Sequence, residues 1–320
     1  MEVSISVADS SLRLHHVLVS SLNDKGELMT SDELLGMMQS MDDQELTRET
    51  IVKAAFPYPG GKQHAITNIL PHIPYTDYFR DVFGGSGAIL LARNKVKNEY
   101  FNDRFSGVTD FYRCVKDRNL LPRLLEWIHF TPFSREEFIR CRGGWKDVQD
   151  PVERAARWYV QVLMSFQAYG RHYGRSKQHN AQFSMKLPNQ LKSFWPCHYR
   201  LQGVYIENQD WRQMFRDLDH PRAVWYLDPP YLGAAEMYED RMSPADHKEL
   251  CERAHDLEGF VALSGYDNPI YNSFSWDEKY SWEARETSNA GIGTETNGRI
   301  GTEGSNSGIR IECLWIKDFK

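Results

Sequence analysis

Apolar runs separated by glycine turns and by polar helical segments predict alternating strands and helices over two stretches of the chain. In the first stretch, residues 77–83 have the pattern of a strand, residues 84–87 of a glycine turn, residues 88–93 of a helix and residues 99–102 of a second strand. Helical sequence then follows to about residue 115. This order of elements is typical of the start of a doubly wound α/β sheet.

The same alternation resumes in the last third of the chain. Ser243 followed by Pro244 predicts the N-terminus of a helix, because serine caps a helix well and proline fits its first turn. Six glycines between residues 288 and 308 predict a loop. The elements predicted in this part are a strand at 223–227, a helix at 243–256 and strands at 260–264 and 310–316.

The middle of the chain, roughly residues 118–206, does not follow a strand–helix repeat, and its charge sets it apart. No Asp or Glu occurs in the 53 residues from 154 to 206, which carry eight Lys and Arg residues and ten aromatic ones. All 44 acidic residues therefore lie elsewhere, together with 30 of the 38 basic ones. Such a segment is typical of a surface that follows nucleic-acid phosphates, although a solvated cationic face has the same composition.

The composition of the whole chain excludes several classes of protein. At 320 residues it can bury a full core, and its net charge of −6 excludes a uniformly basic nucleic-acid coat. Its five cysteines form no CxxC pair and its histidines are scattered, so we expect no disulfide framework, no metal and a reducing, cytoplasmic setting. The absence of a long apolar run or a signal-peptide pattern predicts a soluble protein.

The first glycine turn predicts a nucleotide-type pocket. Gly84, Gly85 and Gly87 follow a predicted strand, and Asp103 ends the next one, where an acidic side chain can accept both hydroxyls of a ribose. Leu90 stands where a dinucleotide fingerprint has a small residue, and the chain lacks the Lys-Ser/Thr pair of a P-loop. A nucleoside ligand without a pyrophosphate therefore fits best.

A second polar constellation follows the apolar run 223–227. Asp228, Pro229, Pro230 and Tyr231 combine a carboxylate, a rigid backbone and a flat aromatic wall. This Asp-Pro-Pro-Tyr motif suits an enzyme that holds a planar exocyclic amine while a methyl group is moved onto it. Upstream, residues 58–62 read Tyr-Pro-Gly-Gly-Lys, a turn whose lysine supplies a point charge beside two glycines.

Taken in order, residues 58–62, 81–87, 102–103 and 228–231 resemble the motifs of the Dam-type, or α-group, DNA adenine-N6 methyltransferases. The resemblance covers about residues 53–318. It implies an α/β fold with a doubly wound, Rossmann-like methyltransferase sheet, mostly parallel with an antiparallel last strand, and an inserted, largely helical DNA-recognition domain. The expected domains are an N-terminal extension of unknown role at 1–52, a catalytic domain at 53–117 and 207–320, and a target-recognition insertion at 118–206.

The resemblance also implies roles for the residues at matching positions. The carboxylate of Asp228 and the carbonyl of Pro229 would accept hydrogen bonds from the target amine, Pro230 would complete the motif, and Tyr231 would stack on the flipped base. S-adenosyl-L-methionine, converted to S-adenosyl-L-homocysteine, would be bound by Tyr58, Gly60, Gly61, Lys62, Asp81, Phe83, Gly85, Gly87, Asp103 and Asp210. Double-stranded DNA would be contacted by Arg171, Tyr173, Arg175, Lys177, Asn180 and Lys186.

Some positions depart from the family pattern and leave alternatives open. Pro57 stands where several members place a DNA-contacting lysine, so their target sequence cannot be assumed. An N4-cytosine methyltransferase also acts on the exocyclic amine of a base, but the catalytic motif of that class more often begins with serine. A DNA-binding protein with a decayed methylation site is a further alternative, against which the intact Asp103 and Asp228 argue. The oligomeric state, monomer or weak dimer, and a restriction-modification or phage context stay open.

Overall fold

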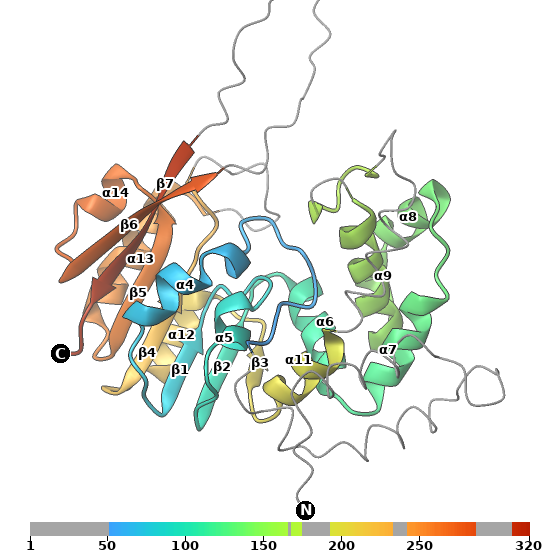
Figure 1. Cartoon of the computed structure of the whole chain (residues 1–320), viewed down its shortest axis with the longest axis horizontal. Helices are drawn as coiled ribbons and strands as arrows, with labels where there is room; N and C mark the ends of the chain where they lie inside the picture. The colour runs from blue at the N-terminus through green and yellow to red at the C-terminus, as the bar shows by residue number, and fades with distance from the viewer. Residues whose placement is uncertain (1–50, 166–167, 175–192, 233–241, 286–308) are drawn as a thin grey trace, which may run out of the picture. The chain divides into compact units, whose positions relative to one another are not determined.

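The computed structural model describes residues 51–165, 168–174, 193–232, 242–285 and 309–320 of the chain (Figure 1). Nearly all of the predicted N-terminal extension lies outside these residues, as does the glycine-rich segment 288–308. Four of the predicted DNA contacts also lie outside them, namely Arg175, Lys177, Asn180 and Lys186.

The strands form one mixed sheet in the order β3-β2-β1-β4-β5-β7-β6. Strand β4 pairs in parallel with β1 and β5, β2 pairs in parallel with β3, and β7 is antiparallel to both β5 and β6. The predicted sheet, mostly parallel with an antiparallel last strand, is therefore confirmed. Its strands are β1 (Tyr78–Asp81), β2 (Asn98–Asn102), β3 (Tyr205–Glu207), β4 (Ala223–Leu227), β5 (Phe260–Tyr266), β6 (Glu278–Arg285) and β7 (Ile309–Lys317).

Contacts between residues divide the chain into two compact units. The first runs to Ile66 and resumes over Gly84–Gln209, and the second comprises Thr67–Phe83 and Asp210–Lys320. Before β1 the chain forms short turns, η1 (Lys62–His64), α4 (Ile66–Ile69) and η2 (Leu70–His72). The later helices of the first unit are α5 (Ala88–Ala92), α6 (Ser106–Lys116), α7 (Leu120–His129), α8 (Arg135–Arg142), η3 (Trp145–Asp147), α9 (Pro151–Met164) and α11 (Phe194–Leu201). Those of the second are α12 (Trp211–Leu218), α13 (Pro244–Asp256) and α14 (Pro269–Asn272).

Helix α9 is the centre of the helical part of the first unit. It packs against α6, α7 and α8, and it buries Trp158 and Tyr159 completely or nearly so. Asp150 caps its N-terminus by accepting a hydrogen bond from the Glu153 amide, and Pro151 occupies the first turn. The segment 118–206 is thus largely helical where it is described, as predicted, while its boundaries as a separate domain stay a prediction.

The core of the second unit is β4, whose residues are all buried. Strand β4 can be uniformly apolar because parallel neighbours flank it on both sides and α12 and α13 cover one face (Figure 1). Helix α13 begins as predicted: Ser243 and Asp246 form a capping box, and Pro244 lies in the first turn. These elements fix the strand end from which the Asp-Pro-Pro-Tyr motif projects.

Two strands were not predicted, while β2, β5 and β7 are longer than predicted and β1 is shorter. From Glu278 to Ala284 of β6, side chains are exposed or half-buried with none fully buried, so this edge strand lacks an apolar run. Strand β3 is only three residues long. Strand β5 continues past Ser264 to Tyr266, because Gly265 and Tyr266 still pair with β7.

Candidate active site

The Asp-Pro-Pro-Tyr motif begins directly after β4, at the carboxyl end of the strand. Asp228 is half-buried, whereas Tyr231 is 9% exposed. Ligands of open α/β sheets bind outside the carboxyl ends of the strands, so the motif stands where a site is expected. The two prolines fix the backbone that follows the carboxylate.

A buried hydroxyl holds the Asp228 carboxylate. Ser264 of β5, 1% exposed, donates from Oγ to Asp228 Oδ1 at 2.9 Å. The Tyr226 hydroxyl lies 3.0 Å from the same Oγ. Because a serine hydroxyl has one proton, a Ser264 that donates to Asp228 accepts from Tyr226. The chain Tyr226, Ser264, Asp228 therefore orients the carboxylate from inside the sheet, and the sequence analysis missed it.

If the chain is the DNA methyltransferase that the resemblance implies, replacing Ser264 with alanine is expected to lower kcat about tenfold and to leave KM for DNA nearly unchanged, because it removes the hydrogen bond that positions the Asp228 carboxylate. Steady-state kinetics of methyl transfer check this. The matched control is Ser275→Ala, an exposed serine of the same unit. Equal kinetics for the two variants would remove Ser264 from the site.

A buried histidine lies beside the motif. His247 of α13 is fully buried, and its Nδ1 is 2.7 Å from the hydroxyl of Tyr271. Burial lowers the pKa of His247 to about 4, against smaller opposing effects of the Asp246 carboxylate and the Pro230 carbonyl. Nε2 makes no hydrogen bond of normal geometry within the described residues, so the Pro230 carbonyl acts on the ring as a neighbouring dipole. At neutral pH the imidazole is uncharged.

The free energy of unfolding is expected to fall as pH decreases from about 6.5 to about 4. Over this range an unfolded His247 takes up a proton that the folded one excludes, so the unfolded state binds more protons and is favoured by up to about 3 kcal/mol at the lower limit. Urea denaturation at several pH values measures this loss. The variant His247→Gln should lose less stability over the same pH range. If the variant and the wild type lost the same amount, the pH dependence would not come from His247.

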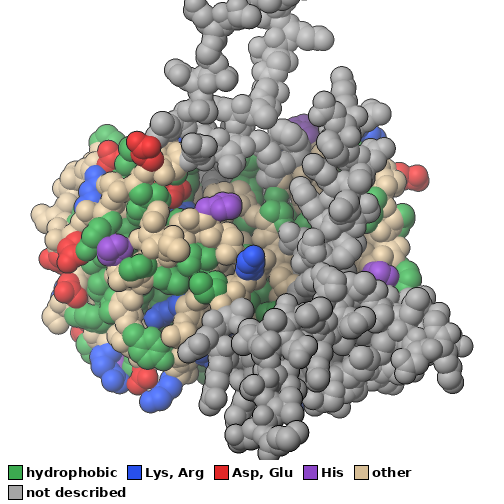
Figure 2. All heavy atoms as spheres, viewed as in Figure 1, with side chains coloured by type: hydrophobic (Ala, Val, Ile, Leu, Met, Phe, Trp, Pro, Cys, Tyr) green, Lys and Arg blue, Asp and Glu red, His purple; other side chains and the backbone are tan. Residues whose placement is uncertain are grey.

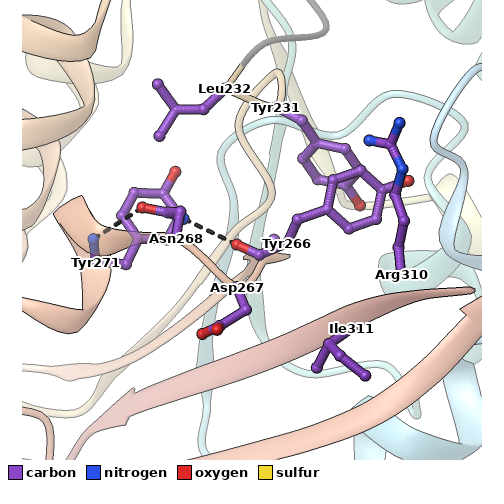
Figure 3. Close-up of a pocket in the computed structure, with 9 residues that line it drawn as sticks. Tyr231, Leu232, Tyr266, Asp267, Asn268, Tyr271, Arg310 and Ile311 are labelled. Atoms are coloured by element: carbon purple, nitrogen blue, oxygen red, sulfur yellow. Dashed lines mark hydrogen bonds between the residues drawn. The ribbon is translucent and has the colours of Figure 1, made fainter.

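Aromatic side chains continue from Tyr231. Its ring centroid is 4.3 Å from that of Tyr266, with the planes inclined by 51°. Its hydroxyl donates a long hydrogen bond of 3.4 Å to Glu312 of β7. Figure 3 shows the rings of Tyr231 and Tyr266 together at the edge of a pocket. A flat side chain held in this way can serve as a stacking platform for a base.

The predicted glycine turn is built in the first unit as a tight backbone bend. Gly87 has φ +70° and Gly85 has φ +50°, which favours glycine. A Cβ on Gly84 would lie 2.1 Å from the Phe101 ring, and one on Gly85 would lie 3.0 Å from the Tyr58 ring. Gly84 is therefore required for space, because the Phe101 ring fills the room of a side chain, whereas Gly85 and Gly87 are favoured by their conformation.

Asp103 supports this turn. One carboxylate oxygen accepts a hydrogen bond from the Gly85 amide at 2.8 Å and the other accepts one from the Phe105 amide at 2.8 Å. The carbonyls of Asp103 and Arg104 both accept hydrogen bonds from Asn208. Asp103 and Gly85, which are 18 residues apart in the sequence, thus come together, while the nucleoside pocket stays a prediction.

The segment 58–62 lies against the same turn. The Gly61 amide donates to the Tyr58 carbonyl at 2.9 Å, and Lys62 is 4% exposed with its Nζ donating to the Gly60 carbonyl at 3.1 Å. A Cβ on Gly61 would lie 3.3 Å from the Ser86 hydroxyl. Tyr58, Lys62 and the glycine turn are therefore brought together within one unit, which the sequence order alone did not establish.

The remaining predicted cofactor residues belong to the second unit. Asp81 ends β1 and is 1% exposed, and Phe83 follows it half-buried. Asp210 caps α12 by accepting from the Arg212 amide at 3.0 Å and forms an ion pair with the Arg212 guanidinium at 3.4 Å. The pKa of Arg212 is raised, mainly by its hydrogen bond to Glu249. Asp210 thus has a helix-capping role, which the sequence analysis did not foresee.

In the recognition segment, Arg171 and Tyr173 lie on a loop anchored to α8 and α9. Ser165 forms an isolated bridge with Tyr173, whose ring packs at 5.6 Å from Phe138. Arg142 donates to the Arg171 carbonyl at 2.7 Å, and Arg171 itself is exposed. The guanidinium of Arg135 lies 5.2 Å from the centre of the Tyr173 ring. Arg171 is therefore presented to solvent from a fixed loop.

Several arginines of the acid-free window form ion pairs with acidic side chains of the protein. Arg154 pairs with Asp110 at 2.8 Å, Arg157 with Glu153 at 2.6 Å, and Arg200 with the buried Glu99 at 2.6 Å. Their acidic partners lie outside the window, so the sequence segregation overstates the basic surface. On the face drawn in Figure 2, basic and acidic side chains of the described residues are interspersed.

The five cysteines all lie in the described part of the chain. All five cysteines are free and buried. Burial raises the pKa of the Cys114, Cys141 and Cys251 thiols to about 12, which disfavours the reactive thiolate. No group of His, Cys, Asp and Glu side chains suited to a metal ion occurs within the described ranges.

Comparison with known families agrees with this arrangement. A sequence model of the D12 class N6 adenine-specific DNA methyltransferases matches residues 58–287, more than two thirds of the 320 residues, and the chain belongs to this family. It is therefore a methyltransferase that depends on S-adenosyl-L-methionine and modifies the N6 amine of adenine in DNA. The Dam-type resemblance is confirmed. No curated protein matches the chain.

No helix in the described part of the chain is long and apolar enough to cross a membrane.

Proposed function

We propose that the Asp-Pro-Pro-Tyr motif is the catalytic centre of this DNA adenine-N6 methyltransferase. The observation that carries the proposal is the bond from buried Ser264 to Asp228, 2.9 Å long, at the carboxyl end of the central strand β4. A carboxylate fixed there can accept a hydrogen bond from the target amine, and the Pro229 carbonyl can accept a second one. Together they orient the nitrogen lone pair, which the purine ring otherwise withdraws.

Tyr231 has the second role in the proposal. The target adenine must leave the duplex to reach Asp228, which costs a few kcal/mol of stacking and pairing. Stacking on the Tyr231 ring, which Tyr266 and Glu312 hold in place, recovers part of that cost. A covalent protein intermediate is unnecessary, because the nitrogen itself attacks the methyl group.

S-adenosyl-L-methionine supplies an activated methyl group on a sulfonium, and we assign its binding to the residues that the family resemblance implies. The glycine turn suits such a ligand because glycine allows a ligand to approach the backbone closely. Asp103 offers carboxylate oxygens to a ribose, as in other nucleoside pockets. The full assignment in this proposal is Tyr58, Gly60, Gly61, Lys62, Asp81, Phe83, Gly85, Gly87, Asp103 and Asp210.

The DNA side of the proposal rests on the target-recognition insertion at 118–206. Arg171 is exposed on an anchored loop and can bind a phosphate. Tyr173, which packs on Phe138, would support that loop, and the remaining predicted contacts follow it in sequence. The proposed partner is double-stranded DNA. The proposed setting is the cytoplasm of a bacterial cell or of a phage-infected bacterial cell.

Two binding assays on the full chain test these assignments. Asp103→Ala should weaken binding of S-adenosyl-L-methionine at least about tenfold, since it removes a charged hydrogen-bond acceptor, and should leave DNA affinity unchanged.

Arg171→Ala should weaken DNA binding and reduce its salt dependence by about one phosphate contact, with cofactor binding unchanged. Unchanged cofactor affinity in the first variant, or an unchanged salt slope in the second, would contradict the corresponding assignment.

A further inference from the structure

Beside Tyr231 lies a pocket of about 410 Å³ that is built wholly from the second unit. Its lining includes the rings of Tyr231, Tyr266 and Tyr271, and also Arg310 and Asp267 (Figure 3). Rings suit a flat heterocycle, whereas the charged side chains suit an ionic group attached to it. The pocket therefore fits a ligand with both parts better than it fits a bare base.

Two charged side chains line the pocket, Asp267 and Arg310. Asp267 is ion-paired with Lys279 at 2.6 Å and accepts from Asn272 at 2.9 Å, and the hydrogen bond from Lys279 is the main cause of its lowered pKa. Its carboxylate thus already has partners on β6 and α14. Arg310 is exposed on β7 and lines the same pocket. An anionic group on the ligand would meet this guanidinium.

Arg310 is held beside the stacking platform. Its guanidinium carbon lies 4.9 Å from the Tyr266 ring centre, and the Tyr266 ring lies 4.3 Å from that of Tyr231. The guanidinium is therefore within about 9 Å of the Tyr231 ring. Glu312, which accepts from the Tyr231 hydroxyl, follows two residues after Arg310 on the same face of β7. Figure 3 shows Arg310 rising from β7 next to the two rings.

We propose that Arg310 binds the phosphodiester that flanks the target nucleotide once its base has left the duplex. A base that stacks on Tyr231 brings its sugar and phosphate with it, and the phosphate needs a cation at the rim of the pocket. The planar guanidinium matches a phosphate with two hydrogen bonds, and the Tyr266 face keeps it in position beforehand. This inference rests on the proposed function, because it assumes that Tyr231 receives the flipped adenine.

The test combines a change in the protein with a change in the DNA. The wild-type chain first methylates plasmid DNA, whose modified adenines give the recognition sequence. Duplexes with that sequence are then made with a neutral methylphosphonate in place of the phosphate on either side of the target adenine. Values of kcat/KM are compared for wild type, Arg310→Gln and the control Arg216→Gln, whose arginine is exposed on α12 at 66%.

For the wild type, one of the two neutral linkages should lower kcat/KM about tenfold, the effect of losing a charge-assisted hydrogen bond. Arg310→Gln should show a similar loss on normal DNA and no further loss on that linkage. Arg216→Gln should behave as wild type. With 2-aminopurine at the target position, Arg310→Gln should also give a smaller fluorescence rise.

Three results would overturn the inference. In the first, the losses of kcat/KM from Arg310→Gln and from the neutral linkage multiply, which means that the Arg310 guanidinium does not bind that phosphate. In the second, Arg310→Gln reacts like wild type on every duplex. In the third, Arg310→Gln loses affinity for S-adenosyl-L-methionine in a DNA-free titration, which assigns the cation to the cofactor. A wild-type chain that methylates no DNA would contradict the proposed function as well, so the two failures are distinguishable.

Discussion

Replacing Asp228 with alanine is expected to lower the rate of methyl transfer at least about a thousandfold and to leave the affinity for S-adenosyl-L-methionine almost unchanged. The nitrogen lone pair of adenine N6 is delocalised into the ring, so it must be drawn out of conjugation before it can attack. In the proposed site this depends on the hydrogen bond from the amine to Asp228, whose carboxylate is oriented by Ser264 at 2.9 Å. Single-turnover rates and equilibrium cofactor binding measure the two effects separately.

Two further variants make the Asp228 result specific. Asp228→Asn keeps the size of the side chain but removes its charge, so a loss of about a hundredfold is expected, smaller than for alanine. Asp217→Ala changes an aspartate of α12 that is 46% exposed and should react like wild type. A variant of Asp228 that loses cofactor binding but methylates normally at saturating cofactor would mean that its role is misassigned.

Replacing Glu99 with alanine is expected to destabilise the fold by about 3–5 kcal/mol, because Arg200 would be left as a buried charge without its partner. Glu99 is 1% exposed and Arg200 8%. Their side chains form two hydrogen bonds of 2.6 and 2.7 Å, and Arg200 also donates to the carbonyls of Leu90 and Arg93. The pair thus joins β2, α11 and the end of α5. Urea denaturation of the full chain measures the change in the free energy of unfolding.

The control for this prediction is an exposed ion pair. Glu252→Ala breaks a pair with Lys248 in which both side chains are more than half exposed, and it should cost less than about 1 kcal/mol. The double variant Glu99→Leu with Arg200→Met should be more stable than Glu99→Ala, since no unpaired charge is left. If Glu99→Ala were as mild as Glu252→Ala, the ion pair would have no part in the stability of the unit.

The sequence predicted those parts of the fold that have a strong local signal. Strand β4 occupies the predicted residues because its five buried side chains form one apolar run, and α13 begins at its predicted cap. Strand β6 was not predicted because its side chains from Glu278 to Ala284 are exposed or half-buried. Its position depends on pairing with β7, which is distant in sequence. Edge strands of this kind are determined by their neighbours and not by their own pattern.

The site follows the same division between local and distant signals. Asp228, Asp103 and the glycine turn could be found because each motif is contiguous or follows a strand. Ser264, His247 and Arg310 could not, since each reaches the Asp-Pro-Pro-Tyr motif or its pocket from another element. The charge of the acid-free window misled in part. Arg154, Arg157 and Arg200 form ion pairs with acidic residues outside the window, which only the fold brings close.

An assay of methyl transfer to DNA tests most directly whether the chain methylates adenine N6 and whether it uses Asp228 to do so. The wild-type chain and Asp228→Ala are each incubated with S-adenosyl-L-methionine that carries a tritiated methyl group and with unmethylated double-stranded DNA, which is then digested to nucleosides. The expected result is label in N6-methyl-deoxyadenosine for the wild type and none for Asp228→Ala. Label in N4-methyl-deoxycytidine, or equal label in adenine for both proteins, would contradict it.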